Sequence, residues 1–340
     1  MMTASSEELK LKKTKMMSWR FHEFGHFSNL KMEEVEIPTP AEGEVLVKID
    51  YAGINPADRF LVMGLYPGAG KPPFSVGRDG CGRIVDTVSN GRFAVGDRVV
   101  FTSTTVGISR DGTLAEYVAI PECEIAALPD WWSPEDGAAG TKVFLTSWQA
   151  LSEAAKLAPG ENVLVTGPSG GVGLATLALS RALGARTIAV ERDPENCKRL
   201  LELGADFVFD TSDPDLVSRV RDLGGADVVT EVIGGESLAR SLAMANSYGR
   251  ICVIGAIGGI KCEIDPTEII FKRLQIHGIQ VSMCSEAESQ QALEKVFAAL
   301  KPGKTTLPID RAFPFDQVPE AFAHMRGGPM GKVLVGPIGD

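Results

Sequence analysis

The sequence predicts an α/β protein in which a doubly wound, parallel six-strand sheet is joined to a second, β-rich domain. Two observations predict this fold class. Between Asn162 and Val281, short apolar strand patterns alternate with helical patterns, as βαβ crossovers in a parallel sheet do. Between Ser18 and Ile120, short strand patterns are separated by turn dipeptides such as Asn90-Gly91, which favours a small barrel or sandwich.

The individual elements follow from periodicity and turn residues. In the β-rich region, strands are expected at Glu44–Tyr51, Gly82–Val88, Arg98–Phe101 and Thr113–Ile120, followed by a helical pattern over Asp136–Ala154. The parallel sheet is expected to use strands at Asn162–Thr166, Thr187–Val190, Phe207–Phe209, Asp227–Val232, Arg250–Ile254 and Gln275–Val281. Helices are expected at Val172–Leu183, Pro194–Leu203, Pro214–Leu223, Ser237–Ala245 and Glu286–Leu300. A last apolar strand at Lys332–Val335 should pair back onto the β-rich domain, and Gly255–Phe271 shows no clear pattern.

Length and charge narrow the classes of function. A chain of 340 residues is long enough for about two domains. The net charge is 34 − 44 = −10, and no long basic run occurs outside the N-terminus, which argues against nucleic acid as the main partner. No apolar stretch approaches the roughly 18 residues of a membrane span, so we expect no membrane partner.

The N-terminus and the cysteines bear on location. The start, MMTASSEELKLKKTK, carries lysines without a following apolar core, so we expect no secretory signal and a flexible extension over residues 1–16. The six cysteines are scattered and form no C-x-x-C pair. Reduced thiols in a cytoplasmic protein are therefore expected.

A glycine-rich turn follows the first strand of the alternating region. The apolar run Val163-Leu164-Val165 ends at Gly167, and Ser169, Gly170, Gly171, Val172 and Gly173 lead into a helical pattern. Strand, glycine turn and helix bring backbone N–H groups and a helix N-terminus up to a pyrophosphate. Pro168 stands where the dinucleotide fingerprint G-x-G-x-x-G has its first glycine, so the surrounding pattern supports this prediction more than the motif does.

The end of the second strand carries two residues that point to different cofactors. Glu191 stands where a carboxylate would bind the adenosine ribose hydroxyls of NAD, and Arg192 stands where a guanidinium would bind the 2′-phosphate of NADP. The sequence leaves open which side chain faces the ribose. The alternative without a binding role is that both residues belong to a strand end exposed to solvent. We favour NADP(H) over NAD(H), because an exposed carboxylate can turn away more cheaply than a phosphate can stay unpaired.

The chain resembles the medium-chain dehydrogenase/reductase superfamily from about Met17 to Pro337. The motifs that carry the resemblance are AGINPAD (Ala52–Asp58), GLY (Gly64–Tyr66), GRDGCGRIV (Gly77–Val85), FAVGDRV (Phe93–Val99), GTLAEY (Gly112–Tyr117), LTSWQAL (Leu145–Leu151), GPSGGVG (Gly167–Gly173), LGAD (Leu203–Asp206) and GKVLV (Gly331–Val335). The resemblance implies a GroES-like catalytic domain of residues 17–150 and 284–340 and a Rossmann dinucleotide-binding domain of residues 151–283. It also implies homodimers through the edge of the dinucleotide sheet.

Within the superfamily, the zinc-free quinone reductase and 2-enoyl reductase branches fit best. In the zinc branch a histidine and a glutamate occupy the positions of Arg78 and Asp79, and a cysteine precedes the segment that here begins at Asn55. Arginine cannot bind zinc, and asparagine is a poor zinc ligand. Only Cys123 lies between Gly82 and Thr141, so the four-cysteine lobe of structural zinc is missing as well. We therefore expect no metal.

The resemblance implies hydride transfer from NAD(P)H to a quinone or an α,β-unsaturated carbonyl compound. Tyr66 matches the proposed proton donor of the 2-enoyl reductases, although it could instead be a loop aromatic packed beside Pro67. Asn55 and Asp58 match, in type and spacing, residues that line the substrate cleft in those branches. We expect Asn55 to position other groups rather than to act as a catalyst, and the alternative for Asp58 is that it only caps a local turn.

Further positions carry over with less force. Thr146 matches a threonine near the nicotinamide, and Lys332 matches a lysine near the cofactor; a core threonine and a solvated lysine are the alternatives. Gly234 and Gly255 are expected at the carboxyl edge of the sheet, where ligands bind. Lys142 departs from the small or apolar residue of quinone reductases and could favour an anionic substrate if it faces the site.

Two other functions remain as alternatives. One is a non-catalytic dinucleotide-binding protein, such as a redox sensor or structural protein, because fold does not dictate function. The other is a zinc-type alcohol dehydrogenase, which the residues at Asn55 and Arg78 make less suitable.

Overall fold

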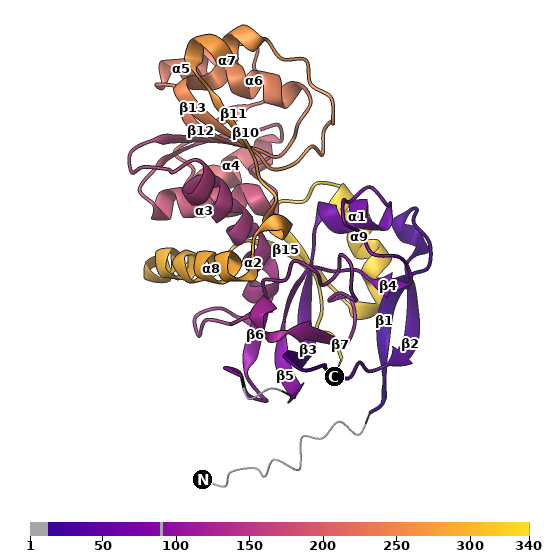
Figure 1. Ribbon diagram of the computed structural model, residues 1–340. Helices are drawn as coiled ribbons and strands as arrows, with labels where there is room; N and C mark the ends of the chain where they lie inside the picture. The colour runs from indigo at the N-terminus through magenta and orange to yellow at the C-terminus, as the bar shows by residue number, and fades with distance from the viewer. Residues whose placement is uncertain (1–12, 89–90, 340) are drawn as a thin grey trace.

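The computed structural model describes residues 13–88 and 91–339, and it contains two large sheets (Figure 1). The β-rich half holds a seven-stranded sheet in the order β15-β16-β3-β5-β6-β8, in which β7 also pairs with β3. A three-stranded sheet in the order β2-β1-β4 lies in the same half. These strands are β1 (Lys15–Phe21), β2 (Lys31–Glu36), β3 (Glu44–Ile54), β4 (Phe74–Ser75), β5 (Asp79–Thr87), β6 (Arg98–Phe101), β7 (Tyr117–Pro121), β8 (Ile125–Ala127), β15 (Ile309–Phe313) and β16 (Lys332–Val335).

The second sheet has six strands that are all parallel, in the order β11-β10-β9-β12-β13-β14. Its strands are β9 (Asn162–Thr166), β10 (Arg186–Glu191), β11 (Phe207–Asp210), β12 (Ala226–Glu231), β13 (Ala245–Val253) and β14 (Gln275–Gly278). The helices that connect them are α3 (Gly171–Ala182), α4 (Pro194–Glu202), α5 (Leu216–Asp222), α6 (Glu236–Met244) and α7 (Pro266–Lys272). The strand order reverses between β9 and β12, and ligands bind at such a switch point, beyond the carboxyl ends of the strands. The predicted fold class is confirmed.

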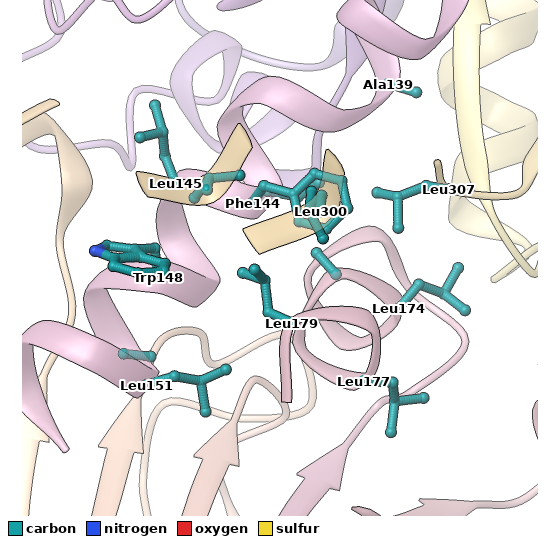
Figure 2. Close-up of a cluster of buried hydrophobic side chains, with 14 of the residues drawn as sticks. Ala139, Phe144, Leu145, Trp148, Leu151, Leu174, Leu177, Leu179, Leu300 and Leu307 are labelled. Atoms are coloured by element: carbon teal, nitrogen blue, oxygen red, sulfur yellow. The ribbon is translucent and has the colours of Figure 1, made fainter. Parts of the chain in front are cut away.

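Helix α2 (Pro134–Trp148) connects the two halves, and α8 (Glu286–Leu300) lies beside it (Figure 1). Figure 2 shows the apolar cluster that α2 and α8 form with α3, with Phe144, Trp148, Leu174 and Leu300 among its members. The same cluster takes in Val100 and Cys81 of the β-rich sheet and Val163 and Val165 of the parallel sheet. One continuous core therefore holds the two sheets together, and the site described below depends on that connection.

The structure agrees with most of the predicted elements and adds several. Strands β6, β9 and β16 have the predicted bounds. Helices α1 (Pro56–Val62) and α7, which have seven residues each, were not predicted. Strand β7 begins at Tyr117 and not at Thr113, and the helical pattern after α2 continues as a π-helical turn over Gln149–Ala154. The C-terminal return is confirmed, because β16 pairs with β3, and helix α9 (Val318–Arg326) precedes it.

The predicted N-terminal extension, residues 1–16, is two residues too long. Strand β1 begins at Lys15, and the ammonium of Lys13 pairs with Glu116 at 2.8 Å. The rest of the extension, residues 1–12, lies outside the described part of the chain. The domain bounds at 150/151 and 283/284 stay a prediction. In the described ranges 13–88 and 91–339, no helix has the length and apolar character needed to cross a bilayer.

Candidate active site

The glycine-rich turn connects β9 to α3 at the switch point of the parallel sheet. Gly167 has a φ of +57°, and Gly170 is the residue before the first turn of α3. A Cβ on Gly173 would lie 2.3 Å from the Gly167 oxygen, so only glycine lets the helix pack this closely on the turn. The Ser169 carbonyl accepts a hydrogen bond from the Gly331 N–H at 3.0 Å, and this contact ties the turn to the segment that enters β16.

The N-terminus of α3 also touches α2 and β16. A Cβ on Gly171 would lie 2.8 Å from the Lys332 side chain and 3.2 Å from Val143 of α2. The Val172 carbonyl accepts from the hydroxyls of Ser147 and Thr176. Residues predicted to bind a dinucleotide therefore lie directly against the other half of the molecule.

Glu191 ends β10 and is buried, whereas Arg192 is exposed. One carboxylate oxygen, Oε1, accepts the backbone N–H groups of Arg192 at 2.8 Å and Asp193 at 3.2 Å. The other oxygen, Oε2, is buried and has no hydrogen-bond partner among the described residues. The premise that favoured NADP(H), an exposed carboxylate that can turn away, is therefore wrong. Two backbone N–H groups hold the Glu191 side chain in place and leave one acceptor oxygen unused.

Gly234 and Gly255 lie just beyond the ends of β12 and β13, as predicted. Gly234 has a φ of +73°, and its N–H donates to Glu231 at 3.0 Å. A Cβ on Gly255 would lie 2.7 Å from the Val232 oxygen. Sequence reasoning missed Glu231, a fully buried carboxylate that accepts hydrogen bonds from Thr166, Ile233, Gly234, Ser237 and Ser241. Glu231 could have been identified in the sequence from its position at the end of a predicted strand, directly before Val-Ile-Gly-Gly.

Asn55 and Asp58 share the start of α1. The Asn55 backbone N–H donates to Asp58 Oδ2 at 2.8 Å, and Asp58 Oδ1 lies 3.3 Å from Nε of Arg78. Burial raises the pKa of Asp58 above its ordinary value, and the neighbouring Arg78 charge opposes this shift. Asp58 thus caps the helix, as one alternative held, and also anchors the Arg78 guanidinium.

The Asn55 side chain bridges two charged groups. Its Nδ2 donates to Asp79 Oδ2 at 2.8 Å, and its Oδ1 accepts from the Lys332 ammonium at 2.7 Å. Lys332 also lies 3.3 Å from the same Asp79 oxygen and is buried, so the alternative of a solvated lysine is wrong. Because Lys332 lies against Gly171 as well, this network connects the start of α1 to the glycine-rich turn.

Tyr66 is half-buried, and its hydroxyl contacts three polar side chains. Arg78 Nη1 donates to the hydroxyl at 2.8 Å, and Gln280 Nε2 donates at 3.2 Å. Ser282 Oγ lies 3.3 Å away, and the Arg78 guanidinium also lies over the Tyr66 ring, 4.9 Å from its centroid. Since Gln280 and Ser282 follow β14, the Tyr66 hydroxyl contacts both halves of the molecule. Tyr66 is therefore more than a loop aromatic packed beside Pro67, which was the alternative drawn from the sequence.

Helix α2 contributes two further side chains. Lys142 is buried, and its ammonium donates to the Ser103 carbonyl at 2.6 Å. Thr146, one turn later, donates its hydroxyl to the Lys142 carbonyl at 2.8 Å. Burial lowers the pKa of Lys142 to about 8, and the charge of Asp79 opposes this shift.

The structure therefore brings Asn55, Asp58 and Tyr66 together with Arg78, Asp79 and Lys332. Sequence reasoning considered Arg78 only as a residue unable to bind zinc and missed its contact with Tyr66. Across residues 13–88 and 91–339, no group of three or more His, Cys, Asp or Glu side chains could hold a metal ion.

Comparisons with known proteins agree with this architecture. The model of the alcohol dehydrogenase GroES-like domain matches residues 41–130, and the model of the zinc-binding dehydrogenase family matches residues 171–298. The chain is 30% identical to the quinone oxidoreductase of Rattus norvegicus over 328 residues, which cover 94% of this chain and 97% of the rat protein.

Two solved structures are similar over almost the whole chain. An alcohol dehydrogenase superfamily protein from Novosphingobium aromaticivorans has 26% identity and a TM-score of 0.84 and covers 94% of this chain and 99% of its own. A mycobacterial protein, Rv1454c, solved in complex with NADPH, also has 26% identity and a TM-score of 0.84, with the same coverage. Together with the match to the rat protein, these findings confirm the predicted family: the chain belongs to the quinone oxidoreductase branch of the medium-chain dehydrogenase/reductase superfamily.

Proposed function

We propose that this protein is an NAD(P)H-dependent oxidoreductase that reduces a quinone or an α,β-unsaturated carbonyl compound without a metal ion. The observation that carries the proposal is the environment of the Tyr66 hydroxyl. Its oxygen accepts hydrogen bonds from Arg78 and Gln280, so its own O–H remains available to a third group. A substrate carbonyl oxygen can take the place of Ser282, whose contact at 3.3 Å is the longest of the three.

The residues at the switch point fit a nicotinamide dinucleotide. The N-terminus of α3 suits the pyrophosphate, and the glycines let backbone approach it. The unused, buried Oε2 of Glu191 suits a ribose hydroxyl, which can donate a hydrogen bond to it. The oxygens of a 2′-phosphate accept hydrogen bonds and do not donate them, so a phosphate could not pair with Oε2. Its negative charge would also be repelled by this carboxylate. The position of Glu191 therefore favours NAD(H), in contrast to the preference drawn from the sequence, and the exposed Arg192 is the group that would make NADP(H) acceptable.

The charged groups of the site do not form a ligand set for zinc. Asn55, Arg78 and Lys332 contribute an amide and two cations, and two of these three groups repel a metal ion. Asp79 is already bound to Asn55 and Lys332 through Oδ2. Stabilisation of a negatively charged oxygen in this site therefore falls to protein cations.

The mechanism assigns separate roles to these side chains. A bound reduced nicotinamide supplies the hydride. Tyr66 donates a hydrogen bond to the substrate carbonyl and, as negative charge develops there, transfers its proton. Arg78 donates to the Tyr66 oxygen at 2.8 Å and stabilises the phenolate that this transfer leaves. Water then restores the tyrosine proton.

The Asn55–Asp79–Lys332 network positions the reacting groups. Its members are buried and hydrogen-bonded to one another, and Lys332 contacts Gly171 at the start of α3. Such a network keeps the tyrosine-bearing segment and the dinucleotide turn at a set separation, which rapid hydride transfer requires. We assign Asn55, Asp58 and Lys332 to positioning.

We also propose that two chains associate through the edge of the parallel sheet. Strand β14 stands at the end of the strand order, so one row of its backbone groups faces away from the sheet. The segment leading into it exposes large apolar side chains, with exposed fractions of 89% for Ile260, 82% for Phe271 and 64% for Ile270. An open edge flanked by apolar surface suits a second copy of this chain.

Substitution of Tyr66 by phenylalanine tests the proposed function. Removal of the O–H should lower kcat for an enone such as 1-octen-3-one by about 10²–10⁴-fold, because general acid catalysis contributes that much. Binding of NADH, measured by its fluorescence, should be unchanged because Tyr66 does not hold the cofactor. Turnover close to that of the unmodified protein would remove Tyr66 from this role. Failure of the unmodified protein to oxidise NADH or NADPH with any quinone or enone would reject the function itself.

A further inference from the structure

Lys142 is the buried cation of the site that lacks a direct counterion. Its ammonium has three N–H donors, and in the described residues only one of them has an acceptor, the Ser103 carbonyl at 2.6 Å. No carboxylate of the described residues forms an ion pair with it, whereas Arg78 pairs with Asp58 and Lys332 pairs with Asp79.

The carboxylates around Lys142 are bound to other groups. Asp79 and Asp58 hold the other two cations. Glu124, the third nearby carboxylate, accepts hydrogen bonds from the hydroxyls of Ser103 and Thr105. These groups influence the Lys142 ammonium at longer range, and Asp79 has the largest effect among the charges. Two N–H donors of a buried ammonium are therefore left for a molecule that enters the site.

The exposure of the site residues indicates where such a molecule would enter. Lys142 keeps an exposed fraction of 8%, Arg78 of 9% and Thr146 of 9%, whereas Asp58 and Asp79 have none. Lys142, Arg78 and Thr146 thus retain some contact with solvent, whereas Asp58 and Asp79 do not.

We propose that Lys142 binds the substrate oxygen on which negative charge develops during reduction. This inference rests on the proposed function and names a second group that serves the same reaction. When hydride adds to the β-carbon of an enone, the nicotinamide is oxidised and the C=C electron pair shifts to leave an enolate oxygen. In a quinone, the same addition of two electrons and one proton leaves a hydroquinone anion. An ammonium that is not neutralised beforehand interacts more strongly with this charge than with the neutral substrate, and only such a difference accelerates the reaction.

The dependence on pH separates this role from a structural one. Because burial lowers the pKa of Lys142 to about 8, the ammonium is charged at pH 7 and loses its charge as the pH rises above about 8. We expect kcat with 1,4-naphthoquinone to fall above that pH. Lys142→Met should lower kcat at pH 7 by about 10²-fold, with a flat profile between pH 7 and 9 and an unchanged KM for NADH. Lys142→Arg should keep part of the activity and show no fall near pH 8, because its charge persists.

A second readout needs neither cofactor nor turnover. The phenolate of 4-nitrophenol, recognised by its yellow absorption band, resembles an enolate in charge and shape. The unmodified protein should bind it as the phenolate below the pH at which it ionises in water. Lys142→Met and the more polar Lys142→Gln should both lose this effect, and Leu201→Met on α4 serves as the control.

The outcomes are decisive in each direction. A fall of kcat near pH 8 that disappears in Lys142→Met, together with loss of the phenolate band, would establish the role. Equal kcat values and pH profiles in the unmodified protein and Lys142→Met would overturn the proposed role of Lys142. A phenolate band that is unaltered in Lys142→Met and Lys142→Gln would overturn it as well. If the unmodified protein reduces no quinone or enone but binds the phenolate through Lys142, the proposed function is wrong and the anion site remains.

Discussion

Replacement of Lys142 by methionine should stabilise the protein at neutral pH, even though we expect it to impair catalysis. Burial disfavours the charged ammonium, and no carboxylate among the described residues pairs with it directly. Methionine has a similar length and carries no charge, so it removes the cost of burying the ammonium. Active-site residues commonly lower the stability of the folded protein while they serve the reaction, and Lys142 would be such a residue.

The magnitude follows from the pKa. The ordinary value of 10.5 falls to about 8 in the folded protein, so the folded chain binds fewer protons than the unfolded chain between these two values. Stability therefore rises with pH through this window, since it rises wherever the unfolded state binds more protons. The penalty is about 3 kcal/mol at pH 7 and falls to about 1 kcal/mol at pH 10, at 1.36 kcal/mol for each pKa unit. The Ser103 carbonyl loses its donor in Lys142→Met, which offsets about 1 kcal/mol at every pH.

Urea unfolding of both proteins at pH 7 and pH 10 tests this reasoning. The advantage of Lys142→Met in the free energy of unfolding should shrink by about 2 kcal/mol between the two pH values. Other groups titrate in both proteins and cancel in the difference. An advantage that does not change with pH would show that the Lys142 pKa is not lowered and would refute the argument. The matched variant Lys156→Met, at an exposed lysine, should show no such dependence.

Two further predictions concern the cofactor and the association of chains. Glu191→Gln keeps an oxygen for the N–H groups of Arg192 and Asp193 but replaces the free acceptor by an NH₂ group. The Kd for NADH should therefore rise by about 10- to 100-fold, because a hydrogen bond to a charged group is lost. The Kd for NADPH should not rise. An equal change for both cofactors, measured by fluorescence titration, would disprove the role of Glu191. Phe271→Glu should convert dimers to monomers in light scattering, whereas Leu201→Glu, equally polar and placed on α4, should leave them intact; a monomeric unmodified protein would reject the interface.

Local patterns in the sequence were sufficient to predict the parallel sheet and the approximate positions of its strands, although β13 begins at Ala245 and not at Arg250. The run at Asn162–Thr166 is short and apolar and ends at Gly167, and the run at Lys332–Val335 in the β-rich sheet lies between Gly331 and Gly336, so their ends were well defined. Helix α1 was not predicted because its large apolar residues Phe60, Leu61 and Val62 are consecutive and show no helical spacing. Asn55 and Asp58 at its start were identified on other grounds. A helix is recognised in a sequence by apolar residues three and four positions apart, and this segment lacks that spacing.

The side-chain contacts of the site could not be predicted in the same way. Tyr66 meets Gln280 across 214 positions of sequence, and no local pattern reports such a contact. At Glu191 the composition of the strand end left two cofactors open. The orientation of its carboxylate depends on the backbone of Arg192 and Asp193, which only the folded turn defines. Lys142 was recognised as unusual in the sequence, but whether its charge was neutralised depended on Ser103, Asp79 and Glu124, which lie in other parts of the chain.

The most direct test of a metal-free reductase is the oxidation of NADH by 1,4-naphthoquinone in protein whose zinc content has been measured. Samples before and after dialysis against a chelator should contain less than one zinc per chain and oxidise NADH at the same rate, with one hydroquinone formed for each NADH consumed. A stoichiometric zinc whose removal abolishes turnover, and whose return restores it, would contradict the roles assigned here to Tyr66 and Arg78.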